Sequence, residues 1–96
     1  MSETTLPPDD LPWVVYMLRC ADGSLYTGIT TQLERRLHEH NHSPKGARYT
    51  RHRRPVDLVY SERHSSRSSA SKREAAIKKL ARRDKEVLMA SPQKNK

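Results

Sequence analysis

The feature that most constrains the fold is a short turn sequence between two strand candidates. The apolar run from Trp13 to Leu18 is rich in β-branched and aromatic residues, which predicts a strand buried on both faces. A second strand is predicted from Ser24 to Thr30, and Ala21-Asp22-Gly23 lies between the two. The segment therefore predicts a β-hairpin whose register depends on the length of its loop.

The loop length decides which side chains share a face of this hairpin. A two-residue Asp22-Gly23 loop would place Tyr16 and Tyr26 on opposite faces. A three-residue loop, with Gly23 in the left-handed conformation, pairs Tyr16 with Gly28 and places both tyrosines on one face. We favour the three-residue loop, because Gly23 suits the left-handed position and because this register gathers polar groups together.

A helix is predicted directly after the second strand. Either Thr30 or Thr31 can cap its N-terminus, and Pro44 marks its end. At about 100° per residue, one stripe of this helix contains Leu33, Arg36, Leu37 and His40. An arginine and a histidine on an apolar stripe indicate a site. The simpler alternatives are a salt bridge from Arg36 to Glu39 or His40, a surface arginine, and a satisfied core histidine at position 40.

The remaining chain is predicted to add one strand and two helices. The expected segments are a basic loop from Lys45 to Arg54, a strand from Val56 to Tyr60, a polar linker from Ser65 to Ser69, a helix from about Ser69 to Arg83, and a last helix from Asp84 to Ala90. We expect residues 1–12 to form a flexible lead, 13–90 a single domain and 91–96 a disordered tail.

Composition narrows the class of protein. A chain of 96 residues with a formal net charge of +8 and a pI near 10.1 favours a polyanionic partner, most often nucleic acid. Cys20 is the single cysteine, so an internal disulfide is excluded, which suits a reducing cytoplasm. The N-terminus lacks the pattern of a secretory signal, and no apolar stretch approaches the length of a membrane span.

Glu74 has two opposed interpretations. In the pattern Ser71-x-x-Glu74, the glutamate would cap a helix backbone. If the helix starts at Ser68 or Ser69 instead, Glu74 falls on the buried stripe with Ala70, Ile77 and Ala81. A carboxylate there needs a cation or a strong partner, which indicates an active-site or metal-binding role. The sequence leaves both interpretations open.

Two further groups of residues are candidates for binding. His38, His40 and His42 resemble a metal cluster, but His38 and His42 lie off the apolar stripe, so we do not expect zinc. The basic segment combines phosphate-binding side chains with an aromatic ring suited to stacking on a base or sugar. Its candidate nucleic-acid-binding residues are Lys45, Arg48, Tyr49, Arg51, Arg53 and Arg54.

Taken in order, these residues resemble the GIY-YIG nuclease family. Val15-Tyr16-Met17 matches the first family motif in degenerate form, and Tyr26-Thr27-Gly28 matches the second. The family arginine, histidine and metal-binding glutamate correspond to Arg36, His40 and Glu74. The resemblance spans Trp13 to about Leu88, and the ordered set of residues is far more specific than either tripeptide.

The resemblance implies an α+β fold, with a small three-stranded antiparallel sheet flanked by helices in the order β-β-α-β-α-α. It also implies hydrolysis of phosphodiesters with Mg²⁺ or Mn²⁺, with DNA favoured over RNA. By analogy, Tyr26 is the first choice for the general base, and Tyr16 assists or takes that role. Arg36 would hold the scissile phosphate, Glu74 would bind the metal, and His40 would orient a tyrosine or the phosphate.

The sequence also departs from the family pattern. The first motif lacks its glycine and isoleucine, Ile29 stands where some members have a lysine, and no asparagine follows Glu74 before Met89. We also expect no room for a second, DNA-recognition domain, so a protein partner could supply specificity. Three functions follow: a nuclease acting on branched, single-stranded or damaged DNA, a non-catalytic nucleic-acid-binding protein, and an adaptor.

Overall fold

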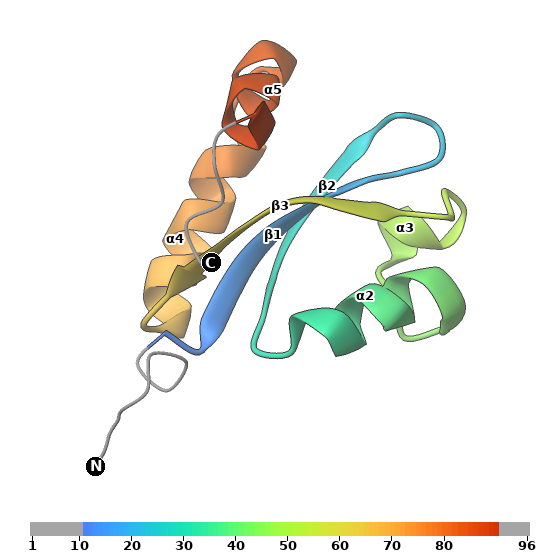
Figure 1. Cartoon of the computed structure of the whole chain (residues 1–96), viewed down its shortest axis with the longest axis horizontal. Coiled ribbons are helices and arrows are strands. Elements are labelled where there is room, and N and C mark those ends of the chain that lie inside the picture. Colours follow the sequence, from blue (N-terminus) through green and yellow to red (C-terminus); the bar gives the residue numbers. More distant parts are fainter. Residues whose placement is uncertain (1–10, 91–96) are drawn as a thin grey trace.

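The computed structural model describes residues 11–90, which form one three-stranded antiparallel sheet with helices on both sides (Figure 1). The elements are β1 (Trp13–Arg19), β2 (Leu25–Thr30), α2 (Leu33–His42), α3 (Arg48–Arg51), β3 (Asp57–His64), α4 (Arg67–Lys78) and α5 (Arg82–Ala90). The strand order is β2-β1-β3, so both partners of β1 are edge strands. The predicted fold class and element order are confirmed, with α3 as an added single turn.

The hairpin has the register that the three-residue loop predicts. Gly23 has a φ of 86°, in the left-handed region that a residue with a side chain avoids. The Cys20 amide donates to the Ser24 carbonyl at 2.8 Å, and the Gly23 amide donates to the Cys20 carbonyl at 2.9 Å. Tyr16 consequently opposes Gly28 across the β1–β2 pair, as predicted.

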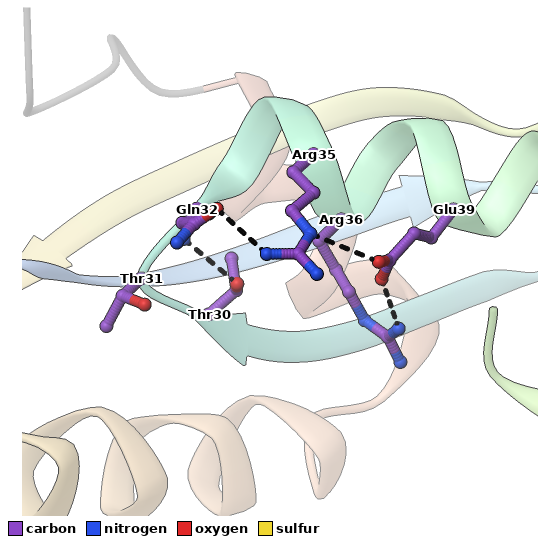
Figure 2. Close-up of a pocket in the computed structure, with 6 residues that line it drawn as sticks. All are labelled: Thr30, Thr31, Gln32, Arg35, Arg36 and Glu39. Atoms are coloured by element: carbon purple, nitrogen blue, oxygen red, sulfur yellow. Dashed lines mark hydrogen bonds and ion pairs between the residues drawn. The ribbon is translucent and has the colours of Figure 1, made fainter. Parts of the chain in front are cut away.

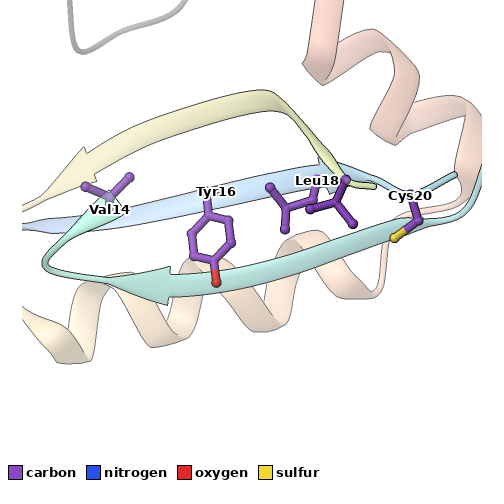
Figure 3. Close-up of a cluster of buried hydrophobic side chains, with 5 residues drawn as sticks. Val14, Tyr16, Leu18 and Cys20 are labelled. Carbon is purple, nitrogen blue, oxygen red and sulfur yellow. The ribbon is translucent and has the colours of Figure 1, made fainter. Parts of the chain in front are cut away.

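β1 is buried on both faces, and each face carries its own core. Val14, Tyr16 and Leu18 form one cluster on β1 (Figure 3). Leu33 and Leu37 of α2 pack against this cluster. Val15 and Met17 point the other way, where α4 adds Ala70 and Ile77. α2 and α3 therefore lie on one side of the sheet, and α4 and α5 lie on the other (Figure 1).

Two expectations for the first part of the chain need correction. α2 begins after Gln32 rather than after a threonine cap, because the Thr30 hydroxyl accepts the Gln32 amide at 3.1 Å and makes a local turn. The Lys45 to Arg54 segment is not wholly loop. Its middle forms α3, because the Thr50 and Arg51 amides both donate to the Ala47 carbonyl at 3.1 Å.

The boundaries after residue 56 also differ from those expected. β3 runs on to His64, because its polar residues find partners on α4. Ser66, in the expected linker, caps α4 by accepting the Ser69 amide at 3.0 Å. α4 ends at Lys78 instead of Arg83, and α5 starts at Arg82. Most of the expected lead and the whole of the expected tail lie outside the described residues.

Within residues 11–90, no helix combines the length and the apolar character that a membrane crossing requires.

The left-handed backbone at Gly23 gives a direct test of the hairpin. A Cβ at this position would meet nothing within 4 Å, so a Gly23→Ala change adds backbone strain without a clash. We expect it to lower the free energy of unfolding by about 1–2 kcal/mol, measured by chemical denaturation. Gly23→Asn should cost less, because asparagine tolerates this conformation. Equal stability of the wild type and the alanine variant would contradict the assigned turn.

Candidate active site

A chain of three buried side chains links the sheet to α2 and α3. The Tyr16 hydroxyl lies 2.8 Å from His40 Nε2, and His40 Nδ1 lies 2.8 Å from Thr50 Oγ1. The Thr50 hydroxyl donates its one proton to the Ala47 carbonyl at 3.0 Å. The Ala47 amide also approaches Nδ1, but at 3.5 Å, whereas the Thr50 contact is 2.8 Å. We assign the Nδ1 proton to the shorter contact, so Nε2 accepts the Tyr16 proton. All three side chains are at most 1% exposed.

The missing side chain of Gly28 makes room for this chain of hydrogen bonds. A Cβ at Gly28 would lie 2.6 Å from the Tyr16 hydroxyl oxygen and 3.1 Å from Cε2 of Tyr26. The Tyr26 ring packs beside Tyr16 with 6.3 Å between centroids, and it meets His40 edge-on at 5.1 Å. The close approach of Tyr16 to Gly28 follows from the register that the three-residue loop predicts.

Arg36 is held at the margin of the same cluster. Its Nη1 donates to Glu39 Oε1 at 2.9 Å and to the Lys45 carbonyl at 2.8 Å. Figure 2 shows Glu39 accepting from both Arg35 and Arg36, in an open pocket of about 190 Å³ that Thr30, Thr31 and Gln32 complete. The expected salt bridge from Arg36 to Glu39 is therefore present.

The electrostatics of the cluster keep its buried groups neutral. Burial raises the pKa of Tyr16 above its usual range, nearby Tyr26 raises it further, and Arg36 opposes both effects. Burial lowers the pKa of His40 to about 4, and the charge of Arg36 adds to this shift. At neutral pH, Tyr16 therefore keeps its proton and donates it to an uncharged His40.

Arg36 remains charged in this setting. Burial on its own would lower the pKa of Arg36, but the hydrogen bond to Glu39 and then the interactions with Tyr16 and Tyr26 raise it above its usual value. A fixed cation thus lies beside two tyrosine hydroxyls.

Glu74 approaches from the opposite side of the sheet. The cap of α4 is Ser66, so the Ser71 capping box does not form, and Glu74 is free of that role. Its side chain is 22% exposed, and its Oε2 pairs with Lys78 Nζ at 3.2 Å. Its charge contributes to the raised pKa of Tyr16. An open pocket of about 270 Å³, lined by Leu25, Tyr26, Tyr49 and Lys78, lies between these groups.

The donor set at Glu74 fits magnesium better than zinc. Among residues 11–90, no three His, Cys, Asp or Glu side chains converge as a metal cage. Mg²⁺ commonly takes one or two carboxylates and completes its shell with water and substrate phosphate, so a single Glu74 suffices. His40 is buried and hydrogen-bonded to Tyr16 and Thr50, whereas His38 and His42 lie exposed.

Part of the basic segment serves the fold. Arg54 donates to the carbonyls of His40, Glu39 and Ser43 and so closes the end of α2. Arg51 donates to the Pro44 carbonyl at 3.1 Å.

Arg53 pairs with Asp22 at 3.0 Å and places its guanidinium 4.0 Å from the centre of the Tyr49 ring. Lys45, Arg48 and Tyr49 are exposed. The guanidinium groups of Arg51, Arg53 and Arg54 are thus already engaged within the chain.

The structure brings Tyr16, Tyr26, Arg36 and His40 into one cluster and sets Glu74 across the edge of β2. Sequence reasoning missed Thr50, which holds His40 in place, and named Glu39 only as a salt-bridge alternative for Arg36. Thr50 gave no signal, because it lies in a segment read as a solvated loop. Glu39 gave a weak signal through its spacing of three residues from Arg36.

Comparison with known proteins agrees with this arrangement. Residues 12–87 match the family described as the GIY-YIG catalytic domain, which is most of the chain and includes every residue of the cluster. The chain belongs to the GIY-YIG family. Membership of a nuclease family supports nuclease chemistry in general and a divalent metal as its cofactor.

The chain is also similar to proteins that it matches over most of their length. The chain is 58% identical over 89 residues to a UPF0213 protein of Desulfotalea psychrophila, covering 92% of this chain and 81% of that one. It is 55% identical over 76 residues to a UPF0213 protein of Natronomonas pharaonis, covering 79% of this chain and 88% of that one.

Two solved structures are similar. The solution NMR structure of a UPF0213 protein from Bacillus halodurans has 46% identity and a TM-score of 0.53, covering 81% of this chain and 82% of that one. The solution NMR structure of the protein EF2693 from E. faecalis has 53% identity and a TM-score of 0.55, covering 77% of this chain and 78% of that one.

The neutral state of His40 predicts a pH-dependent stability. The pKa falls from an ordinary 6.5 to about 4 on folding, so the unfolded chain binds more protons between these values. Stability from this residue is full above pH 6.5 and is lost as the pH falls toward 4, by up to about 3 kcal/mol. Urea unfolding across this range should show the loss. His40→Gln should flatten the curve, and parallel curves for the two proteins would contradict the assignment.

Proposed function

We propose that the chain is a metal-dependent endonuclease that hydrolyses phosphodiesters, with DNA favoured over RNA. The observation that carries this proposal is the meeting of two tyrosines, an arginine and a neutral histidine over Gly28. Four of the five residues that the family resemblance selected lie in this cluster, and Glu74 acts on it electrostatically from α4. The basic charge of the chain supports a polyanionic substrate.

Tyr26 is the better candidate for the general base. Its side chain is half-buried, whereas Tyr16 is 1% exposed and donates its proton to His40. His40, with a pKa near 4, is a poor acceptor for a further proton, so a Tyr16–His40 relay is disfavoured. Tyr26 would take the proton of the attacking water, while Tyr16 and His40 hold its ring and the phosphate in position.

Arg36 supplies the positive charge for the reacting phosphate. Glu39 and the Lys45 carbonyl occupy its Nη1 group, which fixes the guanidinium plane. The remaining N–H groups would bind two phosphate oxygens in parallel and stabilise the charge that builds on them. The same charge would stabilise the phenolate form of Tyr26, which must be present before its oxygen can accept a proton from water.

Glu74 would hold the divalent metal, which stabilises charge on the leaving oxygen when bound. The carboxylate has one oxygen paired with Lys78 at 3.2 Å, so metal binding must compete with that contact. Once displaced, Lys78 would lie beside the pocket that Tyr26 and Tyr49 line, where its ammonium can meet another phosphate. Ile29 leaves the position of the family lysine uncharged, which makes Lys78 the nearest substitute.

The basic segment would extend the binding surface around this site. Lys45 and Arg48 are exposed and suited to phosphates. Tyr49 stacks on Tyr26 with 6.0 Å between centroids, which places an aromatic surface beside the reacting groups. Arg51, Arg53 and Arg54 would add charge to this surface while they brace its backbone. A protein partner could supply further specificity.

A non-catalytic nucleic-acid-binding or adaptor role is the alternative. The observation in its favour is the Glu74–Lys78 ion pair, which neutralises the Glu74 carboxylate. The absence of an asparagine between Glu74 and Met89 points the same way.

Cleavage assays separate the two functions. We expect single-stranded, duplex or branched DNA, or RNA, to be cut in Mg²⁺ and left intact in EDTA, with products resolved by gel electrophoresis. Tyr26→Phe, Arg36→Ala and Glu74→Ala should each lower the rate by about 100-fold or more, because each removes a group that acts on the transition state. Arg35→Ala is the matched control, since Arg35 also pairs with Glu39 but is exposed.

The control variant should cut at a rate close to that of the wild type. Binding without cutting of any substrate in any divalent metal would overturn the nuclease and favour the alternative. Cleavage that is unaffected by Glu74→Ala would leave the nuclease in place and remove Glu74 as the metal ligand.

A further inference from the structure

We infer that Glu62 is a positioning residue, which sets the rotation of α4 about its own axis and thereby aims Glu74 at the site. This inference rests on the proposed role of Glu74. Glu62 lies on β3, is 7% exposed and accepts three hydrogen bonds. Its donors are the Tyr60 hydroxyl at 2.5 Å, His64 Nε2 at 2.7 Å and Arg73 Nε at 2.8 Å.

The geometry of α4 places Arg73 and Glu74 on opposite flanks of one buried seam. Ala70 and Ile77 are fully buried against β1 and define that seam. At about 100° per residue, Arg73 lies on one side of the seam and Glu74 lies on the other. The Arg73 flank is bound to β3 through Glu62. Because β1 lies between β3 and β2, the Glu74 flank then faces β2, which carries Tyr26 and Gly28.

Apolar packing is non-directional, and Ala70 contributes only a methyl group to the seam, so the seam alone constrains this rotation less than directional contacts do. Two directional contacts between α4 and β3, together called the clamp, restrict this rotation. Arg73 binds Glu62, and the Ser69 hydroxyl lies 2.6 Å from His64 Nδ1, one turn earlier on the same flank. The two contacts hold the helix at two points along its length.

Glu62 carries its negative charge in the folded protein. Burial alone would raise the pKa of Glu62, but the hydrogen bonds from Tyr60, His64 and Arg73 lower it below its usual value. The group is therefore an ionised buried carboxylate with its oxygens satisfied. An amide in place of the carboxylate keeps one acceptor oxygen, so either the Tyr60 hydroxyl or Arg73 and His64 would lose their acceptor, and the helix would lose its fixed orientation.

Glu62→Gln tests this inference, because it keeps the shape of the side chain and removes the charge. We expect the Mg²⁺ concentration for half-maximal cleavage to rise about tenfold, as for other residues that orient a metal ligand, with a smaller effect on the rate at saturating Mg²⁺. Titration with Mn²⁺ gives a readout without catalysis. The paramagnetic loss of the Glu74 and Lys78 backbone amide signals in NMR spectra should need about tenfold more Mn²⁺.

Two further variants keep the test decisive. Arg73→Gln leaves the hydrogen bonds of Tyr60 and His64 to Glu62 in place. It should raise the Mg²⁺ and Mn²⁺ concentrations at the midpoints of the two titrations, by a smaller factor than Glu62→Gln. This variant keeps the test available if Glu62→Gln fails to fold. Val56→Ala removes buried methyl groups from the core on the other face of the sheet, so it lowers stability without touching α4. It should leave both midpoints unchanged.

Unchanged Mg²⁺ and Mn²⁺ midpoints in folded Glu62→Gln and Arg73→Gln would overturn the positioning role while the nuclease stands. Equal shifts in Val56→Ala would also overturn it, because general loss of stability would then explain the effect. A wild-type protein that cuts nothing would instead overturn the proposed function.

Discussion

The hydrogen bond between Tyr16 and His40 is the interaction on which the rest of the site depends. It joins the central strand of the sheet to the last turn of α2, and it can form only because Gly28 offers no side chain in its path. Thr50 fixes the other nitrogen of the imidazole and so brings α3 into the same arrangement. One hydrogen-bonded chain thus determines where α2 lies against the sheet and where Arg36 projects.

The narrowness of the sheet makes a two-sided site possible. With β2 at the edge, Tyr16 and Tyr26 can reach over Gly28 from the α2 side, while Glu74 approaches from the α4 side. The two faces have separate apolar cores, so each helix is anchored independently. The α2 face supplies two tyrosines and a fixed cation, and the α4 face supplies a carboxylate. In the proposed mechanism, proton removal and metal binding would take place on opposite sides of one strand.

The features that the sequence predicts correctly are those that depend on local backbone geometry. The left-handed turn at Gly23 fixes the hairpin register, and the register brings Tyr16 to Gly28. The helical period likewise places Arg36 and His40 on one stripe. Contacts that depend on tertiary folding escape the same reasoning. Thr50, ten residues after His40, reads as part of a solvated loop, although it is fully buried in the structure.

The errors near α4 share one cause. Glu62 and His64 are polar, so the third strand seems to end at Tyr60, yet both side chains find partners on α4 and the strand continues. Ser66 and Ser71 both begin patterns that suit a helix cap, and local sequence cannot choose between them. The contacts of Glu62 depend on α4 lying against β3, which local sequence does not reveal.

The protonation of His40 tests the account most directly. Long-range ¹H–¹⁵N NMR correlation spectra at neutral pH distinguish the two neutral forms of an imidazole from its charged form. We predict an uncharged His40 with its proton on Nδ1 and with Nε2 bare to accept the Tyr16 hydroxyl. A proton on Nε2, or a charged ring at neutral pH, would contradict the arrangement of Tyr16, His40 and Thr50 from which the site is built.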